Sequence, residues 1–138
     1  MKISNGASVI LDVKTGEILA IVGSKDYFAT DIDGKFDVAT QALRQPGSSI
    51  KPINYLLALK NGKNLWDTVE DKPVRYKIPG QKDYTPQNYT GKYLGTVTLR
   101  TALASSLNIP SVKLLNENGI GNMIDLAEEM GITTWTDR

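Results

Sequence analysis

The sequence contains no cysteine and no histidine among its 138 residues. Without cysteine it can form no disulfide, no thiolate nucleophile and no thiolate metal ligand. Without histidine it cannot build a Ser-His-Asp or Cys-His catalytic arrangement or the common zinc sites, since each needs an imidazole or a thiolate. We therefore expect no metal site and no cofactor, and any serine nucleophile in this chain needs a different base.

The chain also lacks an excess of charge of one sign and a long apolar run. Its formal net charge is +1, with acidic and basic residues interspersed, which gives no electrostatic basis for a nucleic-acid partner. The apolar run near the N-terminus ends at Asp12 and is too short for a membrane span or a signal-peptide core. We see no linker that divides the chain, so we expect one soluble globular domain or a piece of one.

Local patterns in the first half predict a hairpin, a loop and then a helix. Residues 7–23 contain two apolar runs, rich in β-branched residues, around a turn at residues 14–16. Residues 24–47 are polar and carry glycine and proline, which predicts mostly loop. From about 48 to 61 apolar residues occupy most faces of a helical pattern, with Pro52 in its first turn, where proline is tolerated. We expect this helix to be largely buried.

The second half predicts a long connection followed by helices. Residues 63–97 hold several prolines and glycines, which predicts a connection with a candidate short strand at residues 74–78. Residues from about 98 to 131 predict a helical region in which glycines end the helices. The residues expected to cap or open these helices are Thr98, Pro110 and Asn122.

The segment RQPGSSIKP, residues 44–52, places Ser48 and Lys51 at the start of the buried helix. Backbone N–H groups at a helix start favour developing negative charge. Lys51 follows Ser48 by three residues and so lies on the same helix face, where burial would lower its pKa and leave an amine able to accept a proton. The alternative is that Ser48 only caps the helix and Lys51 extends to water, and the S-x-x-K spacing alone does not decide between them.

A second polar group, Ser106-Leu107-Asn108, interrupts two apolar helical stretches. By itself this triplet is typical of a turn between helices. However, S-x-x-K followed by S-x-N or a relative, and then by K-T-G, is the known signature of penicillin-binding proteins and class A β-lactamases. The order of the first two motifs therefore favours a catalytic interpretation.

Several ordered blocks, covering about residues 7–132, resemble successive segments of a penicillin-binding-protein transpeptidase domain. The blocks are GASVILDVKTGEILAIVGSKDYF, ATQALRQPGSSIKP, DYTPQNYTGKYLGTVTLRTALASSLNIPSVKLL and the helix through DLAEEMGI. The run NY-x-G-x-Y-x-G-x-VTLR-x-AL-x-x-SLN is more similar to the bifunctional, class A type than to the monofunctional type or to a β-lactamase. The resemblance implies an α+β (α/β) fold of the β-lactamase and transpeptidase type, with helices packed on an antiparallel sheet.

The resemblance also implies a peptidoglycan D,D-transpeptidase, in which serine acyl transfer acts on D-Ala-D-Ala stem peptides and β-lactams imitate the donor. By this resemblance Ser48 is the acyl-accepting nucleophile and Lys51 is the base that activates it. Ser106 would relay a proton towards the leaving group, while Asn108 would hold Lys51 and the substrate amide. The neighbouring serine does not compete, because only Ser48 has a lysine three residues later.

Two further residues, Asn88 and Tyr89, are expected to lie near the cleft and contact the substrate. They belong to the same block as the S-x-N motif. The other aromatic side chains of this region are more typical of packing than of substrate binding.

The third motif of the family departs from the expected order. A Lys-Thr-Gly tripeptide stands only at residues 14–16, before S-x-x-K, and the chain stops at Arg138. We interpret the tripeptide as an ordinary turn, because glycine supplies the backbone freedom that a turn needs. Residues 1–138 thus resemble the N-terminal part of a transpeptidase domain, truncated before the later strands.

This departure puts the activity of the chain in doubt. Because the third motif is missing, we expect impaired or absent turnover, with a β-lactam or peptidoglycan sensor and an inert structural fragment as the alternatives. The resemblance implies that the full-length protein lies at the extracytoplasmic face of the bacterial membrane, held there by a segment absent from this chain.

Overall fold

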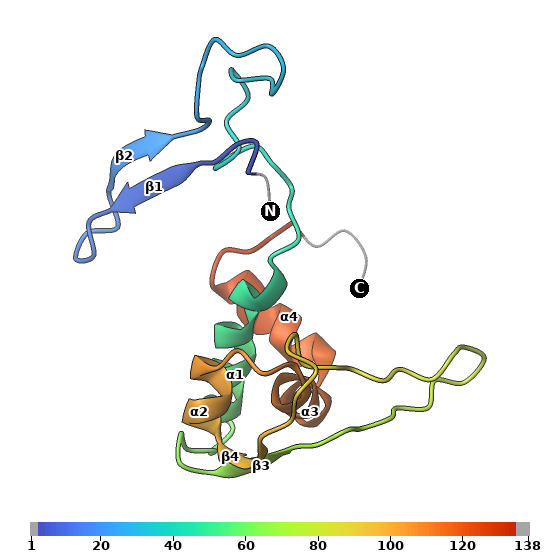
Figure 1. Cartoon of the computed structure of the whole chain (residues 1–138). Coiled ribbons are helices and arrows are strands. Elements are labelled where there is room, and N and C mark those ends of the chain that lie inside the picture. Colours follow the sequence, from blue (N-terminus) through green and yellow to red (C-terminus); the bar gives the residue numbers. More distant parts are fainter. Residues whose placement is uncertain (1–2, 135–138) are drawn as a thin grey trace. The chain divides into compact units, whose positions relative to one another are not determined.

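The computed structural model describes residues 3–134, and the chain forms two compact units that divide between Gln45 and Pro46 (Figure 1). Within the described residues, the first unit contains one hairpin, and the second contains all the helices and a small sheet. The sequence shows no linker at this point, so the division was not predicted.

The first unit is built on an antiparallel hairpin of β1 (Ser8–Leu11) and β2 (Ile18–Val22). Both strands lie within the predicted range of 7–23, and apart from Ser8 they consist of apolar, mostly branched residues, which favour strands. All of their residues are exposed.

The turn between β1 and β2 contains the Lys-Thr-Gly tripeptide. The Asp12 carboxylate accepts hydrogen bonds from the backbone N–H groups of Lys14 and Thr15, each at 2.8 Å. These bonds lower the pKa of Asp12, because they stabilise its charged form. Gly16 has φ of +76°, a conformation that glycine adopts without steric cost. The tripeptide therefore has a complete local explanation as a turn.

The second unit begins with the helix that follows the S-x-x-K serine. A 3-10 turn over Gly47–Ile50 leads directly into α1 (Lys51–Lys60), and Pro52 lies in the first turn of α1. The helix ends where Gly62 takes φ of +94° and Lys63 N–H donates to Ala58 O at 3.0 Å. This ending is the glycine-dependent arrangement expected after a helix that stops before a glycine.

The small sheet of the second unit pairs β3 (Thr68–Asp71) with β4 (Gly95–Thr98) in antiparallel register. Neither strand was predicted, because each has only four residues and their pairing partners lie far apart in the sequence. The short strand expected at residues 74–78 is reduced to a single bridge between Tyr76 and Tyr84, whose rings stack with centroids 6.3 Å apart. The prolines on either side of this segment cannot donate to a ladder.

Three helices complete the second unit, namely α2 (Leu99–Ala104), α3 (Asn108–Asn118) and α4 (Ile120–Glu129). Thr98 caps α2 as predicted, since its Oγ1 accepts a hydrogen bond from Thr101 N–H at 3.2 Å. α3 begins two residues before Pro110, so that this proline lies in its first turn.

The prediction that Asn122 caps the last helix is wrong. Gly119, with φ of +83°, is the residue that precedes α4, so the helix starts earlier and Asn122 already lies inside it. The Asn122 side chain instead donates a hydrogen bond to Asn118 O at 2.7 Å.

The core of the second unit lies around α1, which packs against α2, α3 and α4, while α2 and α3 also contact the small sheet. Figure 1 shows these helices gathered together. Two apolar clusters share α1: Tyr55, Ala58, Leu99, Ala102, Leu107 and Leu114 form one, and Ile53, Leu57, Met123, Leu126 and Ala127 form the other. Full burial of each large aliphatic side chain contributes roughly 1.5–3 kcal/mol. The unit has the expected α+β character.

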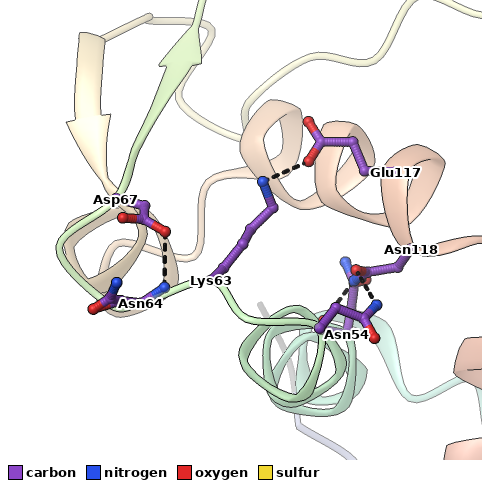
Figure 2. Close-up of polar contacts among 7 residues, drawn as sticks. Asn54, Lys63, Asn64, Asp67, Glu117 and Asn118 are labelled. Carbon is purple, nitrogen blue, oxygen red and sulfur yellow. Dashed lines mark hydrogen bonds and ion pairs between the residues drawn. The ribbon is translucent and has the colours of Figure 1, made fainter.

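Polar contacts between α1 and α3 supplement this core. Asn118 Nδ2 donates to Asn54 O and Asn54 Oδ1, both at 2.9 Å, and Figure 2 shows the two side chains facing each other. Near the other end of α3, Asn54 Nδ2 donates to Ser111 O at 2.8 Å. These bonds satisfy buried amide groups that would otherwise be costly. No helix within residues 3–134 has the length and apolar character needed to cross a membrane.

Candidate active site

A cavity of about 370 Å³ opens beside the start of α1. Its walls come from the 3-10 turn, the first residue of α1, the segment before Asn88 and the first turns of α3. The polar side chains that line it belong to Ser48, Lys51, Tyr84, Gln87, Asn108 and Ser111. Three of the four predicted catalytic residues, Ser48, Lys51 and Asn108, therefore line one cavity. The fourth, Ser106, contacts Lys51 directly.

Ser48 occupies the second position of the 3-10 turn, where Gly47 reverses the chain with φ of +54°. Lys51 N–H donates to Ser48 O, and residues three apart align along a 3-10 turn, so both side chains share one face. Across the part of the chain that the structure describes, the Ser48 hydroxyl makes no hydrogen bond. The residues at the cap positions of the turn and of α1 are Pro46 and Ile50, and neither makes a side-chain cap. The capping role considered for Ser48 is therefore absent.

The neighbouring serine behaves differently. The Ser49 hydroxyl donates a hydrogen bond to the backbone carbonyl of Pro46. This local bond is typical of a serine at the start of a helix. Of the two adjacent serines, Ser48 is the one whose hydroxyl has no hydrogen-bond partner among the described residues.

Lys51 is only 7% exposed, and its Nζ makes three hydrogen bonds. It donates to Ser106 O at 2.6 Å, to Ser106 Oγ at 3.1 Å and to Asn108 Oδ1 at 2.7 Å. The two shorter bonds end on oxygens that can only accept. The Ser106 hydroxyl is the one partner that can also donate, so a neutral Lys51 could keep all three contacts by receiving a hydrogen bond from it.

Burial lowers the pKa of Lys51, because the ammonium form loses hydration. None of the three acceptors is a carboxylate, and Lys51 forms no ion pair among the described residues. The lysine is thus held in position by neutral groups while its charge is left without a counter-ion. That arrangement favours an amine that can accept a proton.

Ser106 adopts φ of +50° in the turn between α2 and α3. A left-handed conformation at a residue other than glycine is costly, and such residues are enriched at functional sites. Here it aims both the carbonyl and the hydroxyl of Ser106 at Lys51.

Asn108 is the first residue of α3 and is partly buried. Its Oδ1 accepts from Lys51, and its Nδ2 donates to Gln87 O at 2.8 Å. Because one end of the amide faces a donor and the other an acceptor, its orientation is fixed by its partners.

The two residues predicted to contact the substrate lie in different environments. Asn88 is only 5% exposed, and its side chain bonds to Asp71, Lys92 O and the start of α3. Tyr89 is fully exposed and does not line the cavity. Instead, Tyr84 and Gln87 face the cavity. The sequence reasoning missed Tyr84 and Gln87. They belong to the block DYTPQNY, which ends with the predicted residues Asn88 and Tyr89, and this shared block was the signal that could have identified them.

Comparisons with known proteins identify the family of the chain. A family model described as the penicillin binding protein transpeptidase domain matches residues 6–137. Penicillin-binding protein 1A of Rickettsia bellii is 40% identical over 129 residues, covering 93% of this chain and 16% of the relative. Penicillin-binding protein 1A of Aquifex aeolicus is 42% identical over 128 residues, covering 92% of this chain and 17% of the relative. The chain thus spans about a sixth of the length of these relatives.

Solved structures give the same result. The crystal structure of penicillin-binding protein 1A from Haemophilus influenzae matches with a TM-score of 0.84 and 37% identity, over 92% of this chain and 18% of the other. The PonA1 protein from Mycobacterium tuberculosis in complex with penicillin V matches with a TM-score of 0.75 and 28% identity, over 96% of this chain and 33% of the other. The Rickettsia and Aquifex relatives are class A proteins, the type that the S-x-N block had indicated. The chain belongs to the penicillin-binding protein transpeptidase domain family.

Proposed function

We propose that the chain carries the nucleophilic part of a serine D,D-transpeptidase site, with D-Ala-D-Ala stem peptides of peptidoglycan as donors. The observation that supports this most strongly is the buried Lys51, which is held by Ser106 and Asn108. It lines the same cavity as Ser48, whose hydroxyl has no partner among the residues that the structure describes. The site offers a nucleophile, a base and a proton path without histidine.

In the acylation step, Ser48 Oγ attacks the carbonyl carbon of the penultimate D-Ala, and the hydroxyl proton passes to the Lys51 amine. An ester bond forms between Oγ and this carbon, and the amide bond to the terminal D-Ala breaks. The leaving nitrogen takes a proton from Lys51 through the Ser106 hydroxyl, and D-Ala departs. The backbone N–H of Ser48, at a helix start, is suited to stabilise the oxyanion.

In the second step, the amine of another stem peptide attacks the ester carbon. The new bond is a peptide cross-link, the ester bond to Ser48 Oγ breaks, and the surplus proton of the amine returns to Oγ by way of Lys51. Asn108 holds Lys51 in place during both steps through its Oδ1. In this proposal Asn108, which lines the cavity, also hydrogen-bonds the substrate amide. Because peptidoglycan lies outside the cytoplasmic membrane, we place the reaction at the extracytoplasmic face of the cell.

β-Lactams are the second class of ligand in this proposal. Ser48 Oγ opens the lactam ring, the ring C–N bond breaks, and the ring nitrogen takes the proton that the donor amide would have taken. The PonA1 structure in complex with penicillin V supports this ligand class.

The decisive experiment is intact mass spectrometry of the chain after incubation with benzylpenicillin. We expect one covalent adduct, which is lost in Ser48→Ala and kept in Ser49→Ala. The second variant is a matched control, because it removes an adjacent hydroxyl that is engaged by Pro46. If the adduct were lost in Ser49→Ala and kept in Ser48→Ala, the nucleophile would be Ser49 and the proposed assignment would be wrong. No adduct on the wild-type chain would show that this chain does not react by itself.

A further inference from the structure

We propose that Asp71 and Asn88 form a buried positioning pair that sets the place of Asn108 and, through it, of Lys51. This inference deepens the proposed function and rests on it for the role of Lys51. Neither residue touches the reacting atoms, so both would act through the catalytic side chains.

Asn88 connects the small sheet to the start of α3. Its Nδ2 donates to Asp71 Oδ1 at 2.8 Å, to Asp71 Oδ2 at 3.0 Å and to Lys92 O at 2.9 Å. Its Oδ1 accepts from the backbone N–H of Asn108 at 2.8 Å and from that of Ile109 at 3.4 Å. Every polar atom of the amide is therefore used inside the chain, and no group remains for a ligand.

The contact with α3 replaces a missing cap. The residue before α3, Leu107, has no side chain that could accept from the first N–H groups of the helix. Those groups need an acceptor, because the first turn of a helix offers none. Asn88, twenty positions before Asn108 in the chain, supplies that acceptor. The start of α3 is thus held by a residue outside the helix.

Asp71 determines which way the Asn88 amide faces. It is the last residue of β3 and is 0% exposed. Its carboxylate accepts from Asn88 Nδ2 and from Leu94 N–H at 2.8 Å, and no described lysine or arginine forms an ion pair with it. A buried carboxylate without a basic partner is expensive. Because ionised carboxylate oxygens only accept, they bind the amide nitrogen of Asn88 and leave its oxygen for α3.

The result is a chain of contacts from the sheet to the base, through Asp71, Asn88, Asn108 and Lys51. Its last step is the bond from Lys51 Nζ to Asn108 Oδ1 at 2.7 Å. A displacement of Asn108 would remove one of the three acceptors that favour the ammonium form. Tyr84 is the other titratable residue among those that line the cavity, and no carboxylate lines it.

The test compares Asn88→Ala and Asp71→Asn with the control Asn118→Ala. Asn118 is also a buried asparagine of this unit with bonds to another element, as Figure 2 shows, but it lies at the far end of α3 and contacts neither Asn108 nor Lys51. Two quantities are measured in each variant: the pH midpoint of Lys51, followed at its Nζ by NMR, and the rate of acylation by benzylpenicillin as a function of pH.

We expect the Lys51 midpoint to fall by about 0.5–1 pH unit in Asn88→Ala and in Asp71→Asn, the amount that one lost hydrogen bond represents. The maximal acylation rate should fall by roughly 10–100-fold, as for misplaced catalytic groups. Asn118→Ala should lower stability and leave the midpoint where it is. If the substitutions only lowered stability, all three variants would be less stable and the pH midpoint of Lys51 would be unchanged in each.

The proposal is overturned if the Lys51 midpoint is unchanged in both variants while near-UV circular dichroism shows a folded chain. It is also overturned if neither variant folds, since the pair would then be required for the fold alone. The NMR titration needs no turnover. If the wild-type chain forms no adduct, the proposed function fails for this chain, whereas the positioning of Lys51 is still decided by the titration.

Discussion

Lys51 Nζ lies 2.7 Å from Asn108 Oδ1, although 57 positions separate the two residues in the chain. The contact exists because α1 packs against α3, so that the first residue of one helix meets the first residue of the other. A lysine at this place loses its hydration and gains neutral partners. The pH at which Lys51 gains or loses its proton therefore reports directly on the environment of the site.

The first prediction concerns pH. Burial lowers the pKa of Lys51 below its ordinary value of 10.5, so the neutral amine becomes populated at lower pH than for an exposed lysine. The acylation rate should accordingly rise with pH and level off below that value. Fluorescent penicillin labelling from neutral to alkaline pH measures this, with Ser48→Ala correcting for non-enzymatic reaction. A rate that does not change with pH would contradict the role of Lys51 as the base.

The second prediction separates the hydroxyl of Ser106 from its backbone conformation. Ser106→Ala and Ser106→Gly both remove the hydroxyl, but only glycine relieves the cost of φ at +50°. We expect both variants to acylate equally slowly, and the glycine variant to be about 1 kcal/mol more stable than the alanine variant. Labelling rates and urea unfolding give the two numbers. Acylation at the wild-type rate in either variant would remove Ser106 from the proton path.

The third prediction concerns Tyr55, which is 2% exposed and whose hydroxyl has no hydrogen-bond partner within residues 3–134. Burial, together with the nearby Asp71, raises the pKa of Tyr55 from 10.0 to about 12. The folded state thus opposes ionisation, and stability should fall as pH rises from 10 towards 12, because the unfolded chain ionises first. Tyr55→Phe should weaken this alkaline loss.

At neutral pH the same variant should be as stable as the wild type, or up to about 1 kcal/mol more stable, since it removes a buried group without a partner. Urea unfolding at neutral and alkaline pH checks both statements. The exposed Tyr89 provides the matched control in Tyr89→Phe. A clear loss of stability in Tyr55→Phe at neutral pH would show that the hydroxyl is bonded in solution.

The fourth prediction concerns the cap of α2. Thr98→Ala removes the acceptor of Thr101 N–H and should lower the free energy of unfolding by about 1 kcal/mol. Thr98→Ser keeps that acceptor and should have most of the wild-type stability. Equal losses in the two variants would show that the methyl group, rather than the cap, stabilises the helix start.

Local signals in the sequence were sufficient for the hairpin and for the helices. The branched residues of β1 and β2, the run from Ile53 to Ala58, and the cap at Thr98 each act within a few residues. These features follow from propensity and periodicity, which are properties of neighbours in the chain. The predicted start of α4 at Asn122 is wrong because Gly119, with φ of +83°, both ends α3 and directly precedes α4.

The candidate site likewise has features that the sequence reveals and features that it does not. The Ser48 and Lys51 spacing is local and was visible, and the resemblance to a family indicated Ser106 and Asn108. Nothing in the polar segment around Asp71 signals a carboxylate that is 0% exposed, because its burial depends on residues far away in the chain. Asn88 was predicted to contact the substrate, and its internal bonds to Asp71 and to the start of α3 are equally invisible in the sequence. Long-range hydrogen bonds of single side chains leave no periodic pattern to read.

The shortest hydrogen bond of Lys51 Nζ is to the main chain, because its acceptor is the backbone carbonyl of Ser106. A carbonyl is present whatever side chain stands at position 106. Selection by an inhibitor could therefore change the side chains around the lysine and still find its amine anchored at this point. The part of the site that is hardest to alter by mutation is the part that every amino acid supplies.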